Sequence, residues 1–300
     1  MGDGGADRGK AMRGRAAVLA AVVMQSVAQV AYGTWLTAVP SPLFVFGTFL
    51  MTAGFFLVVS GRGGTRGAWA PLLILNFGTA LAFLSFFHAL KLIEPAIVSA
   101  VNIGVGPILG IALALGATGA RPGGVRVTVC LGILAGCAVL ALSAAQAGGT
   151  TGGAVALEGL AAAAGTGVGT VIVTTASKAL LDRGWKSGAV LAHRFYLILP
   201  VALLLALGGD SVDWTPALAA TFLAVGIGGV LVPLYLLQTG IRLTDPVTVM
   251  VTMAAMPLVT FAVQGLSPAY AWSGMTAAGL VLITASIVVD MWTGRGRPAA

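Results

Sequence analysis

Charged residues are scarce in this chain. Only 8% of its 300 residues are charged, while 58% are hydrophobic. Soluble globular proteins carry about 25% charged residues. The scarcity therefore excludes a soluble globular domain and predicts that the lipid bilayer is the medium in which the chain folds.

Cysteine and histidine are also rare. The two cysteines, Cys130 and Cys137, lie in one apolar run and form no disulfide framework, and the two histidines have no clustered acids beside them. The glycine-rich stretch AGTGVGT at 164–170 lies inside an apolar run, where glycine permits close helix packing rather than phosphate binding. The sequence therefore predicts no cofactor, no metal site and no enzymatic activity.

Long apolar runs are abundant. Each has roughly 18 to 25 residues, the length with which a helix crosses a hydrocarbon core of ~30 Å. The run that begins at Ala16 exceeds the apolar core of a signal peptide, about 7 to 15 residues, and is assigned as the first span. We predict an all-α polytopic membrane protein with ten transmembrane helices, at 16–38, 43–60, 69–90, 95–117, 127–146, 155–178, 187–208, 215–240, 246–265 and 271–291.

The basic residues alternate with these spans. With the N-terminus in the cytoplasm, fourteen of the sixteen Lys and Arg residues fall on the cytoplasmic side, Lys91 falls outside, and Arg194 lies within the seventh span. All six tryptophans fall at or just beyond predicted span ends, as interfacial residues do. The net charge of +7 is thus a topology signal in loops rather than a nucleic-acid-binding patch, and both termini are predicted to be cytoplasmic.

A short charged segment occurs twice. LKLIEPA at 90–96 joins the third and fourth spans, and IRLTDPV at 241–247 joins the eighth and ninth. Each acid precedes a proline, so Glu94 and Asp245 are predicted to cap the helices that begin at Pro95 and Pro246. Matching positions in two five-span halves indicate a duplication. Because five is odd, the second copy enters the membrane from the opposite face, as an inverted repeat.

These halves define the predicted organisation. It comprises a cytoplasmic tail at 1–15, a first repeat at 16–146, an external linker at 147–154, a second repeat at 155–291 and a cytoplasmic tail at 292–300.

The stretches FFHALKLIEPAIVSAVNIGVGPILGIALAL at 86–115 and YLLQTGIRLTDPVTVMVTMAAMPLVTFAVQGL at 235–266 share an arrangement. An aromatic-rich helix leads through a basic segment to a helix that contains a proline. This arrangement resembles the ten-helix EamA-type branch of the drug/metabolite transporter superfamily, and HRFYLILP at 193–200 resembles the arginine-containing seventh helix of many members. The resemblance covers essentially the whole chain and implies a transporter, but no particular substrate.

Polar residues within spans are candidates for a binding site, because each needs a partner or a water-filled cavity at membrane depth. Gln25, Gln29 and Tyr32 share one face of the first helix, which is expected to line a cavity. Arg194 is expected to attract an anionic group, and His193 to titrate near neutral pH. The full set of candidate substrate-binding residues is Gln25, Gln29, Tyr32, Asn76, Asn102, Thr166, Thr170, His193, Arg194, Gln238 and Thr252.

The sequence thus predicts a secondary transporter, an exporter of a small polar solute that is neutral, zwitterionic or anionic, working by alternating access. Abundant alanine, glycine and valine, with more arginine than lysine, are typical of GC-rich genomes and indicate a bacterial source. The predicted location is therefore the bacterial cytoplasmic membrane. Proton coupling, uncoupled passage and homodimer formation are left open. Two alternatives of other classes are a membrane-embedded enzyme acting on lipid and a scaffold or sensor that transports nothing.

Overall fold

The computed structural model describes residues 3–60, 68–118, 124–147, 149–209, 211–243, 249 and 252–294, and these residues form helices and connecting turns without a strand. The first half contains α1 (Asp3–Trp35), α2 (Ser41–Ser60), α3 (Trp69–Leu92), α4 (Pro95–Thr118) and α5 (Gly124–Ala147). The second contains α6 (Gly149–Asp182), α7 (Ser187–His193), α8 (Ile198–Leu207), α9 (Pro216–Gly226), a π-helix (Ile227–Leu231), α10 (Val232–Leu243), α12 (Met256–Gln264) and α13 (Gly274–Gly294).

Seven helical segments are long and apolar enough to cross a membrane, and three shorter apolar helices lie at 95–109, 252–264 and 274–289. Large apolar side chains cover the outside of the bundle; Val58 is 85% exposed and Leu204 is 69% exposed. Such a surface is unfavourable in water and favourable in lipid. The predicted all-helical chain is confirmed for the described residues, and its apolar helices suit a multi-pass membrane protein.

The structure differs from the predicted spans in three places. The seventh span is two helices, α7 and α8, separated by residues 194–197. The eighth contains the π-helix at Ile227–Leu231. The loop expected at 147–154 is largely helical, because α5 continues to Ala147 and α6 begins at Gly149. The segment around Asp245 and Pro246 lies outside the described residues.

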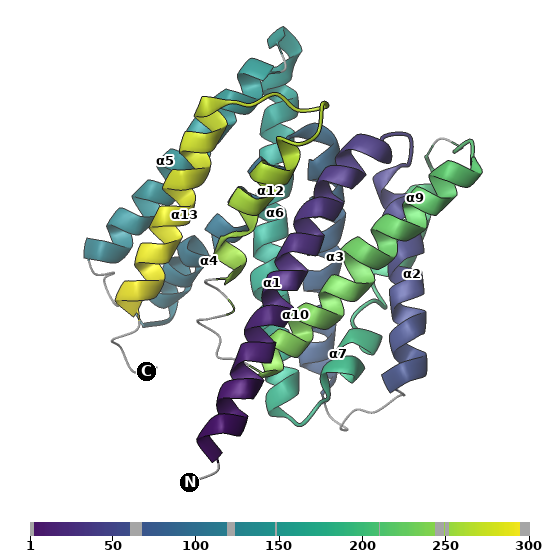
Figure 1. The fold of residues 1–300 in the computed structure, drawn as a ribbon, viewed down its shortest axis with the longest axis vertical. Helices are drawn as coiled ribbons and strands as arrows, with labels where there is room; N and C mark the ends of the chain where they lie inside the picture. The colour runs from purple at the N-terminus through teal and green to yellow at the C-terminus, as the bar shows by residue number, and fades with distance from the viewer. Residues whose placement is uncertain are drawn as a thin grey trace.

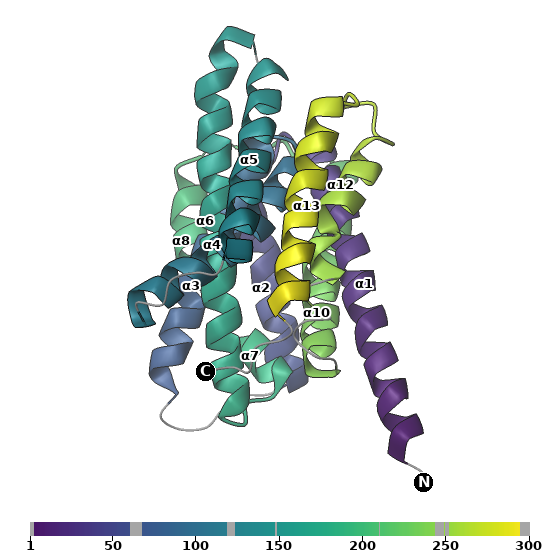
Figure 2. The ribbon, with the colours of Figure 1, turned by 90° about the vertical axis from the view of Figure 1, so that its left-hand side faces the viewer.

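Two groups of three helices form the centre of the fold. In the first, α3 and α4 both pack on α6; in the second, α10 and α12 both pack on α1. Figure 2 shows α3, α4 and α6 on one side and α1, α10 and α12 on the other. We call these groups the α6 triad and the α1 triad. They meet where α4 packs on α12, while α2 packs on α7 and α8, and α5 packs on α13.

Glycines set the close approach of helices within each triad. A Cβ added at Gly169 of α6 would lie 2.5 Å from the backbone nitrogen of Ala82 in α3, and one at Gly240 of α10 would lie 3.1 Å from the carbonyl oxygen of Gly14 in α1. Only a residue without a side chain allows two helix backbones to come so near. The pairs α3–α6 and α1–α10 are therefore held by direct contact between backbones.

The helices run alternately up and down the bundle. In Figure 1, α1 begins and α13 ends at the lower end, and α1 and α12 both end toward the upper end. The junction between α3 and α4 lies at this upper end as well, because Lys91 bonds to the carbonyls that follow α1 and Glu94 bonds to the last residue of α12. "Upper" and "lower" are used below in the sense of Figure 1.

Candidate functional site

The break between α7 and α8 has a local cause in the sequence. Pro200 occupies the third position of α8. A proline has no N–H to donate four residues back, and its ring crowds the carbonyl at that position. Continuous helix is therefore disfavoured at Tyr196, within the segment 194–197 that lacks helical structure.

Asn76 of α3 compensates for the broken helix. Its Nδ2 donates to the carbonyl oxygen of His193 at 2.9 Å and to that of Leu72 at 2.9 Å. Its Oδ1 accepts a hydrogen bond from the backbone nitrogen of Leu197 at 3.3 Å. One carboxamide thus bonds to backbone on both sides of the break. Irregular backbone at membrane depth requires such partners, because lipid offers none.

Arg194 lies at the start of this break and is only 5% exposed. Its Nε donates to the hydroxyl of Thr79 at 3.3 Å, and its guanidinium carbon lies 5.7 and 5.6 Å from the ring centres of Phe83 and Phe195. Within the described part of the chain, Arg194 forms no ion pair with a carboxylate. A buried arginine that is not neutralised is costly and therefore marks a candidate anion-binding position.

His193 precedes Arg194 in the same segment. Its Nδ1 is hydrogen-bonded to the hydroxyl of Tyr196, and its ring lies 5.7 Å from that of Trp185 in an edge-on arrangement. The side chain is half-buried. His193, Arg194 and Asn76 therefore belong to one cluster around the helix break.

The polar face of α1 lies in a packed interface. Gln29 accepts a hydrogen bond from the Ser99 hydroxyl of α4 at 2.6 Å, and its Nε2 lies 3.6 Å from the sulfur of Met256. The fully buried Tyr32 donates to the hydroxyl of Ser41 at 2.9 Å. These bonds satisfy Gln29 and Tyr32 from protein groups in the present conformation, whereas the sequence predicted that this face lines a cavity.

Gln25 and Ser26 lie one turn of α1 before this interface. Gln25 is half-buried. Ser26 is fully buried and accepts a hydrogen bond at 3.0 Å from Thr260 of α12. Polar bonds therefore continue along α1 within its own triad.

Asn102 and Thr170 join α4 to α6, since the threonine hydroxyl donates to Asn102 Oδ1 at 3.1 Å. Thr166 donates to the carbonyl of Ala162 in its own helix. Asn102 and Thr170 thus lie within the α6 triad, separate from the cluster at the helix break.

Gln238 and Thr252 complete the predicted set. Gln238 of α10 is 5% exposed, and its Nε2 has no hydrogen-bond partner among the described residues. Thr252 is half-buried at the start of a short helical turn. Buried amide nitrogens without a partner are uncommon in proteins, so Nε2 of Gln238 is a candidate to bind a solute.

The upper end carries charged contacts between the two triads. Lys91 donates to the carbonyl oxygens of Leu36 and Thr37, the latter at 3.2 Å, and its Nζ lies 4.6 Å from the centre of the Tyr32 ring. Glu94 accepts a hydrogen bond at 2.7 Å from Nε2 of Gln264, the last residue of α12. Burial raises the pKa of the Glu94 carboxyl, although this hydrogen bond acts in the opposite direction.

The predicted capping role of Glu94 is wrong in one respect. α4 does begin at Pro95, as expected. The free N–H of Ala96 in its first turn, however, donates to Oε1 of Gln264 at 3.3 Å. The side chain of Gln264, from the distant helix α12, therefore caps α4. The Glu94 carboxylate accepts a hydrogen bond from the amide nitrogen of the same glutamine. The corresponding prediction for Asp245 falls outside the described residues.

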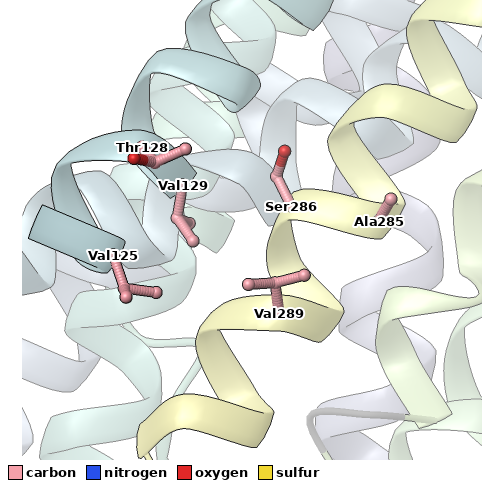
Figure 3. A pocket seen from close by; sticks show the side chains of 6 residues that line it. All are labelled: Val125, Thr128, Val129, Ala285, Ser286 and Val289. Atoms are coloured by element: carbon pink, nitrogen blue, oxygen red, sulfur yellow. The ribbon is translucent and has the colours of Figure 1, made fainter.

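A shallow groove lies elsewhere, on the lower part of α5 and α13. Figure 3 shows its lining residues, which are Val125, Thr128, Val129, Ala285, Ser286 and Val289. The groove is mainly apolar and contains none of the predicted site residues. It therefore lies apart from the candidate site.

Several residues of these clusters were not predicted, namely Ser26, Thr79, Ser99, Met256, Thr260 and Gln264. Ser99 lies three positions before Asn102, so a polar face on the fourth span was a signal that could have identified it. Gln264 is the last residue of α12 and offered no local signal, because its partners are 168 and 170 positions away in the chain.

Comparisons with known proteins give the fold and no function. No protein-family model and no curated protein matches the chain. The chain is similar to a solved structure described as "Crystal structure of protein", with a TM-score of 0.65 and 22% identity, over 96% of this chain and 98% of that one. At this identity the similarity shows a shared overall fold.

Proposed function

We propose that the chain is a secondary transporter in which Arg194, at the break between α7 and α8, contacts an anionic group of a small polar solute. The observation that carries the proposal is the burial of this guanidinium beside irregular backbone, with no acid among the described residues to neutralise it. In transporters, broken helices occur where substrate binds near the middle of the membrane. The nearby rings of Phe83 and Phe195 suit the apolar part of an organic solute.

We further propose that ten spans form two inverted five-span repeats, the organisation of the EamA-type transporters that the sequence resembles. In such a repeat each span of the first half corresponds to the span five places later. The packing of α3 on α6 then corresponds to that of α10 on α1, and the packing of α4 on α6 to that of α12 on α1. Both members of each pair occur, which supports the proposal.

The transported solute is proposed to be an amino acid derivative or another carboxylate, moved out of a bacterial cytoplasm. Gln238, whose Nε2 has no hydrogen-bond partner among the described residues, and Gln25, which is half-buried, are available to bind such a solute when the interface between the triads opens. A pump for lipophilic cations would instead be expected to hold an acid deep in the membrane. Coupling to protons belongs to the same proposal and requires its own measurement.

Flux through proteoliposomes tests the function. Purified protein is reconstituted and supplied with a panel of amino acids, their N-acyl derivatives and the matching amides. Arg194→Gln is expected to lower carboxylate flux at least about tenfold, because a hydrogen bond to a charged group contributes about 1.5–3 kcal/mol. Amide flux should change little. Arg183→Gln, at an exposed arginine in the turn after α6, is the matched control. Equal loss for carboxylates and amides would exclude the anion contact.

Labelling from either side of the membrane tests the topology. In a background lacking Cys130 and Cys137, a cysteine at the exposed Gly153 should react with a membrane-impermeant thiol reagent added to intact cells. A cysteine at Arg183 should react only after the membrane is opened. The opposite pattern would reverse the proposed orientation, in which both termini are cytoplasmic.

A further inference from the structure

The repeated segment LKLIEPA places two charges where the two triads meet at the upper end. Lys91 lies in the last turn of α3 and Glu94 precedes α4, so both belong to the α6 triad. Lys91 bonds to carbonyls that follow α1, and Glu94 bonds to the end of α12, so both partners belong to the α1 triad. We call Lys91, Glu94, Ala96 and Gln264, with the carbonyls of Leu36 and Thr37, the upper clasp.

The partners in the upper clasp are electrically neutral. Lys91 and Glu94 are three positions apart with opposite charges, yet each bonds to an uncharged group of the other triad. Backbone carbonyls at a helix C-terminus attract a cation, and an amide N–H donates readily to a carboxylate. Water can replace either partner, so these contacts can open without leaving a charge buried and unpaired.

Gln264 bonds to two groups at once. Its Nε2 donates to the Glu94 carboxylate at 2.7 Å, and its Oε1 accepts from the N–H of Ala96 at 3.3 Å. One rotation or withdrawal of this side chain therefore releases both bonds. Ser99 lies one turn further along α4, fully buried, and donates to Gln29 of α1. The upper clasp thus lies directly above a polar contact that is sealed between the triads.

We propose that the upper clasp is the closure of one entrance to the solute pathway and that it opens once in each transport cycle, with Gln264 as the residue that releases it. The proposal rests on the proposed transport function, because only a transporter needs this interface to separate. The triads move apart at the upper end, while the glycine contacts inside each triad stay intact. The charges of LKLIEPA then become exposed to water at the entrance.

Thiol accessibility below the upper clasp tests the proposal. The probe is the Ser99→Cys variant, in a background where Cys130 and Cys137 are replaced by alanine, exposed to a charged methanethiosulfonate. Gln264→Leu removes both bonds of the amide and should raise the labelling rate of the introduced thiol about tenfold, the effect of one hydrogen bond to a charged group. The increase is expected from the upper face only, so right-side-out and inside-out membrane vesicles are compared.

Three further variants make the test specific. Glu94→Gln retains a neutral acceptor for Gln264 Nε2 and should raise labelling less than Gln264→Leu does, since the bond is kept but is weaker than one to a carboxylate. Glu94→Leu removes the acceptor and should raise labelling. Gln146→Leu, at an exposed glutamine near the upper end of α5, is the matched control and should change nothing. These comparisons separate opening of the clasp from loss of a glutamine in general.

The outcomes are distinguishable from those of the flux experiment. Unchanged labelling of the introduced thiol in a folded Gln264→Leu protein overturns the clasp, as does equal acceleration from both faces of the membrane or in Gln146→Leu. If the parent protein transports a solute of the panel but Gln264→Leu labels at the parent rate, the clasp is rejected and the transporter is retained. Accelerated labelling from the upper face in a protein that carries no solute of the panel shows that these contacts hold the interface shut, but it counts against the transporter and so overturns the clasp as an entrance to a solute pathway.

Discussion

The interfaces inside the triads and the interface between them are built differently. Inside the triads, glycines let backbones touch, as at Gly169 against Ala82 and at Gly240 against Gly14. Between the triads, polar side chains meet, as in the bond from Ser99 to Gln29 and that from Gln264 to Glu94, whereas inside the triads such bonds, as from Thr260 to Ser26, accompany the backbone contacts. Backbone packing allows one arrangement only, whereas polar side chains can exchange a protein partner for water. The proposed opening at the upper end depends on this difference, because it would separate the triads while each triad stays intact.

The largest expected effect is at a glycine inside a triad. Gly169→Leu would place its Cβ 2.5 Å from a backbone nitrogen of α3, which cannot move aside as a flexible side chain can. We expect a loss of about 3 kcal/mol or more, at the upper end of overpacking costs, and little folded protein. Yield of monodisperse protein in detergent measures it. Gly54→Leu, where no atom lies near the added Cβ, is the control and should fold normally.

Removal of the amide that completes the helix break should have the next largest effect. Asn76→Leu leaves the carbonyl of His193 and the N–H of Leu197 without their present partner. Each unsatisfied buried group costs about 1–3 kcal/mol, so a loss of about 2–3 kcal/mol is expected. Thermal unfolding followed by size-exclusion chromatography measures it. Asn102→Leu is the comparison, because Asn102 bonds to a threonine side chain rather than to backbone, and a similar loss there would contradict the assignment.

A polar contact between the triads should contribute less. Ser99→Ala removes the hydrogen bond to Gln29, and such bonds between membrane helices average about 0.6 kcal/mol. The expected decrease in thermal stability is therefore small, well below that of Asn76→Leu in the same unfolding measurement. If Ser99→Ala proves as damaging as Gly169→Leu, the two kinds of interface are equally rigid and the distinction between them fails.

The smallest effect is expected from the pH dependence of Glu94. Burial holds the pKa of this carboxyl above its ordinary value of 4.5. The folded protein therefore binds this proton more tightly than the unfolded chain does. The resulting stabilisation is complete below pH 4.5 and is lost as the pH rises through the folded pKa. The melting temperature of the parent relative to Glu94→Gln should thus fall as the pH rises from 4.5 toward neutrality, and a rise would contradict the stated burial effect.

Composition and local rules predicted much of the fold. Apolar runs located the helices because the bilayer requires about 20 residues per span. The break in the seventh span was missed although its signal, Pro200, was visible in HRFYLILP. Length and hydropathy describe a span as a whole, whereas a proline acts on one carbonyl four residues back.

The site was less predictable than the fold. Asn76 was correctly singled out as polar, but its bonds to the backbone near residue 193 depend on tertiary packing across 117 positions. The predicted cap at Glu94 failed for the same reason, since a local rule competed with a distant glutamine. The packing of the helices decides which buried polar groups bond to each other. A single sequence shows only that each such group needs a hydrogen-bond partner.

The pairing of α3 with α6 also constrains how the chain assembles during synthesis. Roughly 90 residues separate the end of α3 from the end of α6, which ribosomes translate in about 5 to 18 s at about 5–20 residues per second. During this interval the face of α3 that later packs on α6, which includes Gly78 and Ala82, contacts lipid or other membrane proteins. α1 waits far longer, because its partners α10 and α12 come near the end of the chain. In a nascent chain arrested before α10, α1 lacks both of these packing partners. We therefore expect such a chain to be unstable and to become a substrate for membrane proteases.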